Sequence, residues 1–238
     1  MSFSTPNWPT PEQLKKPITI VPSIPLLMGR RAFLPPIGKD HTFQEPVKKI
    51  TDQSLMAEWE ASEAWCRLID YIQTLNHSVK NCKISHGAAQ PRSGIVNRIV
   101  ALLDELDSWI DLLPPDTSSQ SRFGNITFRL WMDKLNQNVQ QLHLKLFEDL
   151  ATQDLNYTDS IQEISFYLTG AFGDGTRIDY GSGHELSFIA WLCCLDLVEI
   201  TKTEDYNAIV LVVFVRYLDL VRKLQKTYNL EPAGSHGT

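Results

Sequence analysis

The sequence predicts an all-α protein. Apolar residues recur at helical spacing in successive segments, and no segment shows a convincing alternation of apolar and polar residues that would indicate a strand. Proline and glycine clusters separate these segments. A chain of 238 residues can bury roughly 70–75% of its unfolded surface around a core. We expect a multi-helix domain over residues 47–238.

The first 46 residues carry nine of the thirteen prolines. Proline fixes φ and lacks an amide donor, so this arm is expected to be extended or disordered, with short docked pieces at most. A proline-rich ligand for a recognition domain is the alternative interpretation.

The helical segments follow in order along the domain. The first extends from Thr51, where Thr51 or Asp52 is a plausible cap, and the second ends at Pro114-Pro115. The first half of the last helix is apolar all round, which indicates a buried helix. We expect helices over residues 51–79, 95–113, 186–197 and 207–228. Two further helices, between the second and third of these, are expected to end near residues 150 and 168.

The composition excludes several classes of function. A net charge of −6 argues against nucleic acid as the main partner, because phosphate neutralisation needs clustered cations. The longest apolar run, Ala208–Val215, is too short to span a bilayer, so no membrane contact is expected. The first residues lack the basic and apolar regions of a secretory signal, so none is expected. No pair of cysteines has C-x-x-C spacing, so we interpret the four as core thiols: Cys66, Cys82, Cys193 and Cys194.

The most unusual stretch is Thr176–Glu185, which reads Thr-Arg-Ile-Asp-Tyr-Gly-Ser-Gly-His-Glu. Its two carboxylates, Asp179 and Glu185, converge if the chain folds back at the glycines, and Mg²⁺ takes one or two carboxylates together with phosphate oxygens. The alternative is that Asp179 pairs with Arg177 or caps the following helix, whose positive end Glu185 would favour. His184 suits a hydrogen bond at a helix start better than a role as ligand or base.

A second stretch, Ser121–Trp131, offers charged and neutral donors near a helix N-terminus. Such a set suits an anion. Phe123 and Phe128 could stack on a base or on a proline ring. In the alternative interpretation, both phenylalanines are core residues and the arginines pair with acidic side chains.

These residues also carry a resemblance. Arg-Phe-Gly-Asn-x-x-Phe-Arg at 122–129, Thr-Arg-Ile-Asp-Tyr-Gly-x-Gly-His-Glu at 176–185, and Glu-Pro-Ala-Gly-Ser-His-Gly at 231–237 occur in this order. The sequence from about Ile50 to Gly237 closely resembles the phosphotyrosyl phosphatase activator family. Members of that family activate protein phosphatase 2A and are described as peptidyl-prolyl cis-trans isomerases.

The resemblance implies an all-α fold with core, linker and lid parts, and ATP with Mg²⁺ in a pocket beside a prolyl-peptide groove. The implied metal ligands are Asp179 and Glu185. No catalytic residue is assigned with certainty, and Tyr180 and His184 are the candidates. Phe123, Phe128 and Tyr180 are candidates for contacting the proline ring, and Arg177 for a carbonyl. The implied nucleotide-binding residues are Arg122, Gly124, Asn125, Thr127, Phe128 and Arg129.

The resemblance also predicts a missing part. Family members continue with Val-Trp-Gly-Leu-Asp-Asp and further helices where this sequence ends at Thr238, so we expect the domain to lack its C-terminal part. The implied function is ATP- and Mg²⁺-dependent prolyl isomerisation on protein phosphatase 2A. A non-catalytic, ATP-dependent assembly chaperone and an inactive fragment are the alternatives.

The same resemblance implies the partners and the location. The expected partners are the catalytic and scaffold subunits of protein phosphatase 2A and a prolyl peptide. We expect a monomer in the cytoplasm, with the nucleus as a second location.

Overall fold

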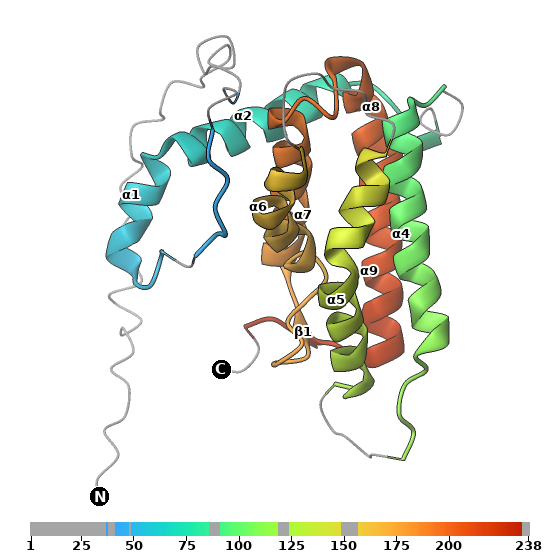
Figure 1. Cartoon of the computed structure of the whole chain (residues 1–238). Coiled ribbons are helices and arrows are strands. Elements are labelled where there is room, and N and C mark those ends of the chain that lie inside the picture. Colours follow the sequence, from blue (N-terminus) through green and yellow to red (C-terminus); the bar gives the residue numbers. More distant parts are fainter. Residues whose placement is uncertain are drawn as a thin grey trace, which may run out of the picture.

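The computed structural model describes residues 37, 41–47, 49–85, 91–118, 124–148 and 157–234. Within these ranges the chain is almost entirely helical, which confirms the predicted all-α class (Figure 1). None of the helices in the described ranges is both long and apolar enough to cross a membrane.

The first predicted helix is divided in the structure. A 3₁₀ turn (Gln53–Leu55) leads into the short helix α1 (Met56–Glu60), and α2 (Glu63–Ser78) follows. Asp52 caps the 3₁₀ turn by accepting from the amide of Ser54, as one of the two predicted caps. The prediction of one continuous helix is wrong because Ser62 adopts an extended conformation and accepts from the amide of Trp65, which starts a new helix there.

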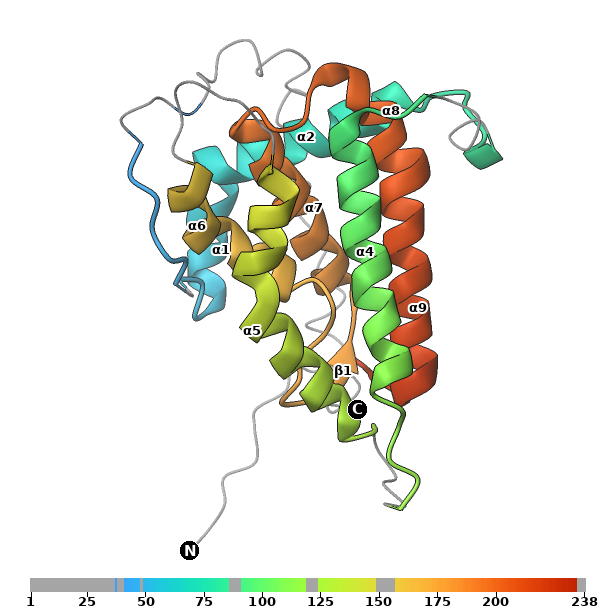
Figure 2. The same ribbon diagram turned by 45° about the vertical axis from the view of Figure 1, so that its right-hand side comes forward.

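Three long helices form one side of the molecule: α4 (Gly94–Leu112), α5 (Thr127–Phe147) and α9 (Val215–Tyr228). Figures 1 and 2 show α4 running beside both α5 and α9. The apolar residues that recur at helical spacing along α4 are buried, and so are four apolar residues on the inner side of α5. Those four are Trp131, Leu135, Leu142 and Leu146.

The remaining layer consists of α6 (Tyr157–Thr169), which lies against α5, and α7 (Ser182–Leu197), which lies against α6. Helix α7 begins four residues earlier than predicted, so Ser182, Gly183, His184 and Glu185 form its first turn. The last four residues of the stretch Thr176–Glu185 are therefore helical. Helix α2 lies across one end of the bundle, where it packs on α7 and α8 (Tyr206–Ala208) (Figures 1 and 2).

The last helix is continuous from α8 to α9 but contains a π-helical segment, Ile209–Phe214. This segment coincides with the run that is apolar all round, and three of its six residues are buried, namely Ile209, Leu211 and Val213. A π-helical turn shifts the phase of the following residues, so the apolar face of α9 cannot be extrapolated from the residues before it.

Two short strands complete the described fold. β1 (Asp179–Tyr180) pairs in parallel with β2 (Glu231–Pro232), with Asp179 opposite Glu231 and Tyr180 opposite Pro232. Both lie at the end of the bundle away from α2 (Figure 1).

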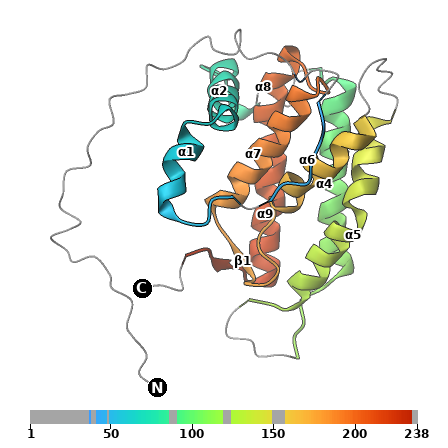
Figure 3. The same ribbon diagram turned by 60° about the vertical axis from the view of Figure 1, so that its left-hand side comes forward.

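Most of the predicted proline-rich arm lies outside the described residues. Residues 41–47 form neither helix nor strand and contact α6. The side-chain amide of Gln162 donates to the carbonyl oxygen of Phe43 at 2.8 Å, and the amide of Gln44 donates to Glu163 Oε2 at 3.2 Å. Figure 3 shows this segment passing along α6.

Candidate functional site at the β1 end of the bundle

The segment between α6 and α7 is a tightly bonded turn. Asp174 Oδ1 accepts from the backbone amides of Thr176 (2.8 Å) and Arg177 (2.9 Å), and the Asp174 carbonyl accepts from the amide of Ile178 (2.7 Å). Ile178 has φ of +54°, a left-handed conformation that is unfavourable for a β-branched residue. Because the surrounding bonds fix the turn so closely, they hold this strained residue in place.

The carboxylate of Asp179 is paired with an arginine. Its side chain is 3% exposed, and it accepts from Arg177 Nε at 2.7 Å and from Arg177 Nη2 at 3.2 Å. The same guanidinium also contacts Asp174 Oδ2 through Nη1 at 2.9 Å. The hydrogen bonds to Asp179 and the charge of Asp174 raise the pKa of Arg177. The sequence left open whether Asp179 binds a metal ion, pairs with Arg177 or caps a helix. In the structure Asp179 pairs with Arg177.

Glu185 lies in the first turn of α7, near two tyrosines. The hydroxyl of Tyr217 donates to the Ala171 carbonyl oxygen at 2.7 Å and lies 2.9 Å from the Tyr180 hydroxyl. Burial raises the pKa of Tyr180 to about 12, and the nearby charge of Glu185 acts in the same direction. Burial also raises the pKa of Tyr217. Both phenols are therefore neutral at physiological pH, and they bond to each other through their hydroxyl groups.

The two predicted metal ligands have different surroundings. Successive side chains of a strand point to opposite faces, so Asp179 and Tyr180 diverge. Asp179 turns toward Arg177, whereas Tyr180 turns toward Tyr217 and the charge of Glu185. Asp179 is thus paired with Arg177, whereas Glu185 acts on Tyr180.

His184 acts as a hydrogen-bonding residue at the start of α7. Its Nδ1 lies 2.7 Å from the carbonyl oxygen of Gly170, and its ring stacks on Tyr180 with centroids 5.5 Å apart. Because a carbonyl oxygen only accepts, Nδ1 must carry the proton in this arrangement. The histidine thus joins the end of α6 to the start of α7.

The second unusual stretch contacts the first. Gly124 has φ of +55°, and a Cβ atom built there would lie 2.5 Å from Ile178 Cγ2, so only glycine fits without a shift. Arg129 donates through Nε and Nη2 to the carbonyl oxygens of Gly175 and Thr176, both at 3.0 Å. The two stretches singled out in the sequence are therefore parts of one site. Arg122 and Phe123 lie outside the described residues.

Asn125 and Thr127 hold the chain that follows α4. Asn125 Oδ1 accepts from the amides of Asp116 (3.0 Å) and Thr127 (3.1 Å), and its Nδ2 donates to the Asp116 carbonyl oxygen (2.8 Å). The Thr127 hydroxyl also accepts from the Asp116 amide. The Asn125 amide donates to the carbonyl oxygen of Tyr228 at 2.7 Å. These contacts join α4, α5 and α9 at one end.

Replacing Asn125 by alanine should lower the free energy of unfolding by about 2–3 kcal/mol. The change removes three hydrogen bonds and leaves two backbone amides and one carbonyl oxygen without that partner. Urea denaturation measures the loss. The matched control is Asn138→Ala, which removes a single bond to Lys134 within the same helix and should change stability by about 1 kcal/mol or less. Equal effects of the two variants would contradict this structural role.

Phe128 lies in the core. It is 0% exposed and stacks in parallel with Trp131, with ring centroids 6.2 Å apart. The nucleotide-contact prediction gains no support from this position, because a fully buried ring has no free face for a ligand.

The described residues do not fit Mg²⁺ and ATP as arranged. Both oxygens of Asp179, the amide of Asn125 and the guanidinium of Arg129 already have protein partners. No cluster of three or more His, Cys, Asp or Glu side chains that could hold a metal ion occurs within the described ranges. Mg²⁺ needs near-octahedral oxygen ligation, so binding through Asp179 would first require displacement of Arg177.

Three residues of this site were not identified from the sequence: Asp174, Tyr217 and Tyr228. An Asp-Gly-Thr sequence at Asp174 is typical of a turn in which the aspartate accepts from following amides, and this signal was present. Tyr217 and Tyr228 lie on the apolar face of α9, and their spacing indicates core packing only. The bonds that they make to Ala171 and Leu113 depend on tertiary structure.

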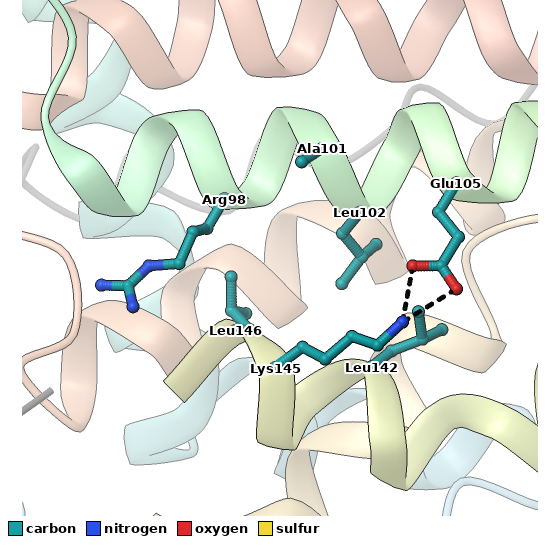
Figure 4. A pocket seen from close by; sticks show the side chains of 7 residues that line it. All are labelled: Arg98, Ala101, Leu102, Glu105, Leu142, Lys145 and Leu146. Atoms are coloured by element: carbon teal, nitrogen blue, oxygen red, sulfur yellow. Dashed lines mark hydrogen bonds and ion pairs between the residues drawn. The ribbon is translucent and has the colours of Figure 1, made fainter. Parts of the chain in front are cut away.

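A small hollow lies elsewhere, between α4 and α5 (Figure 4). Its apolar floor includes Leu102, Leu142 and Leu146, and Lys145 pairs with Glu105 across it at 3.1 Å. At a helical rise of about 1.5 Å per residue, Leu142 lies roughly 22 Å along α5 from Thr127. This hollow is therefore distant from the β1 end and takes no part in the site.

Comparison with known proteins identifies relatives of the chain. A sequence model described as phosphotyrosyl phosphate activator (PTPA) protein matches residues 46–238. The chain is 41% identical over 199 residues to a probable serine/threonine-protein phosphatase 2A activator 1 of Dictyostelium discoideum, covering 84% of this chain and 58% of that protein. It is also 41% identical over 209 residues to a serine/threonine-protein phosphatase 2A activator 2 of Neurospora crassa, covering 86% and 45%.

The fold has a solved counterpart. The crystal structure of the PP2A phosphatase activator Ypa1 superposes with a TM-score of 0.70 at 30% sequence identity, covering 81% of this chain and 60% of that chain. The chain spans about half the length of the curated relatives it matches.

Proposed function

Because the chain belongs to the phosphotyrosyl phosphate activator family, we propose that it binds and activates a serine/threonine protein phosphatase 2A. The relatives that match over more than four-fifths of the chain carry the name of such activators. The observation that carries the proposal is the assembly of the motif residues into one packed end of the bundle. Arg129 binds the Gly175 and Thr176 carbonyls, and β1 binds β2.

Prolyl isomerisation on the phosphatase is the finer proposal. Rotation about the peptide bond faces a barrier of about 18–20 kcal/mol, and no covalent bond changes, so no nucleophile is needed. A protein accelerates this rotation by binding the twisted amide more tightly than the planar one. Tyr180 and His184 are the candidate residues for that role, and the half-buried ring of His184 can pack on a proline ring.

Non-catalytic assembly is the second candidate, and a specific observation favours it. The polar groups of Tyr180, His184 and Asp179 are already bonded to Tyr217, Gly170 and Arg177. Groups held in this way shape a surface but do not offer free donors to a substrate. Binding of Mg²⁺ and ATP stays a prediction from the resemblance.

Retention of the phosphatase tests the proposal. We expect the immobilised full chain to retain purified catalytic and scaffold subunits, and the conservative surface variant Asp133→Asn on α5 to retain them equally well. The assay is run with and without Mg²⁺ and ATP. Failure to retain either subunit under both conditions would contradict a role as a phosphatase 2A activator.

A prolyl-peptide assay separates the two candidates. Isomerase function predicts acceleration of cis-trans interconversion in proportion to protein concentration, unchanged in Asp133→Ala. Retention of the phosphatase without any acceleration would instead support non-catalytic assembly. Cooperative thermal unfolding in the same preparation argues against the inactive-fragment alternative.

A further inference from the structure

We propose that Arg177 is an internal counter-cation that neutralises Asp179. The ion pair fixes the conformation of the turn before β1, so that β1 pairs with β2 without a bound metal ion. The carboxylate that the family resemblance assigns to Mg²⁺ is, in this arrangement, part of an internal ion pair. This inference does not depend on phosphatase binding and is tested separately.

The charge arrangement carries the proposal. A single guanidinium is held between two carboxylates, with Nε and Nη2 directed to Asp179 and Nη1 to Asp174. The side chain of Asp179 is 3% exposed, whereas that of Arg177 is 56% exposed. The carboxylate is thus withdrawn from water while its counter-ion still reaches solvent.

Burial makes a cation at this position necessary. An ionised carboxylate that has left water is strongly unfavourable unless it is paired and hydrogen-bonded. Two N–H donors of Arg177 meet both oxygens of Asp179, and planar guanidinium groups suit this arrangement better than a point charge does. A magnesium ion would have to displace these donors before it could use the same oxygens.

The Arg177–Asp179 ion pair stabilises the pairing of β1 with β2. The carbonyl oxygens on either side of Asp179, those of Ile178 and Tyr180, accept from the amides of Glu231 (3.0 Å) and Ala233 (2.8 Å). The Asp179 carbonyl itself accepts from the amide of Asp174 at 3.0 Å. Fixing the Asp179 side chain therefore fixes the backbone that receives β2.

A double-mutant cycle tests the ion pair. In the full chain, Arg177→Gln should lower the folding equilibrium constant by roughly 10- to 100-fold, because it leaves the buried Asp179 carboxylate without its counter-charge. Asp179→Asn should lower it less, because Arg177 is 56% exposed and keeps Asp174 as a partner. The double variant, in which neutral amides face each other, should lose about as much as one single variant. Losses in the double variant equal to the product of the two single losses would overturn the proposal.

Arg177→Lys keeps the cation and provides a second readout if Asp179→Asn does not fold. The proposal predicts that Arg177→Lys recovers at least half of the midpoint shift caused by Arg177→Gln in thermal unfolding. A lysine variant as unstable as the glutamine variant would contradict the counter-cation role.

The effect of magnesium on the unfolding midpoint tests whether Asp179 binds a metal ion instead. A ligand that binds only the folded state raises the unfolding midpoint with concentration. We expect MgCl₂ and Mg–ATP to give wild type, Asp133→Asn and Asp179→Asn the same midpoint change. A rise in wild type that is absent from Asp179→Asn would show that the carboxylate takes a metal ion, and would overturn the proposal.

Discussion

Replacing Phe128 by alanine is expected to lower the free energy of unfolding by about 3–5 kcal/mol. The ring is 0% exposed, stacks on Trp131 and tilts against Tyr228 with centroids 5.8 Å apart. It also lies beside Gly173, where a Cβ atom would meet Phe128 Cζ at 3.0 Å. Truncation therefore opens a cavity at the point where α5, α9 and the β1 turn meet.

Chemical denaturation measures this loss, with Phe166→Ala as the matched control. Phe166 lies on α6 with 45% exposure, so its truncation should change stability by about 1 kcal/mol or less. If Phe128 instead served mainly as a nucleotide platform, its truncation would impair nucleotide binding and leave stability near that of the control. A loss below about 1 kcal/mol would contradict the core assignment.

Acidification from pH 6.5 to pH 4 is expected to remove about 3 kcal/mol of stability through His143 alone. This side chain is 0% exposed, and its burial lowers its pKa to about 4. Its Nε2 accepts from the indole N–H of Trp191 at 2.9 Å, and its Nδ1 lies 2.7 Å from the Val139 carbonyl oxygen. Both contacts are satisfied by the neutral ring.

Stability falls on acidification because the folded and unfolded states protonate His143 at different pH values. As pH falls below about 6.5, the histidine of the unfolded chain becomes protonated while that of the folded chain stays neutral. The unfolded state then binds more protons, so stability falls until the folded-state pKa near 4 is passed. The stabilisation is fully present above pH 6.5 and is lost on acidification.

Unfolding of wild type and His143→Gln across this pH range measures the effect. A neutral glutamine cannot titrate, so the difference in pH slope between the two proteins isolates His143. Identical slopes for wild type and His143→Gln would contradict the assignment.

Sequence periodicity predicted the long helices well, because each has one buried face. The apolar stripe of α4 from Ile99 to Ile110 is buried, and Pro114-Pro115 follows its end. Periodicity failed where local chemistry decides the boundary. Ser62 divides the first predicted helix by capping, and the apolar run 209–214 contains no polar residue that would reveal a π-helical turn.

The sequence singled out both stretches, but it left open whether Asp179 pairs with Arg177, caps a helix or binds a metal ion. Both stretches drew attention through glycines and mixed polar groups, and the structure brings them together through Arg129 and Gly124. Whether Asp179 faces Arg177 or a cation depends on the left-handed turn at Ile178, and a β-branched residue gives no signal for such a conformation. The two-residue strands are also too short to produce an alternating pattern.

Activation of protein phosphatase 2A tests the central claim most directly. Purified phosphatase in a low-activity form is incubated with the full chain, and its hydrolysis of a phosphorylated peptide is then measured against time and chain concentration. The account predicts a saturable increase in phosphatase activity that heat-denatured chain does not produce. Unchanged phosphatase activity at chain concentrations that saturate binding would contradict it.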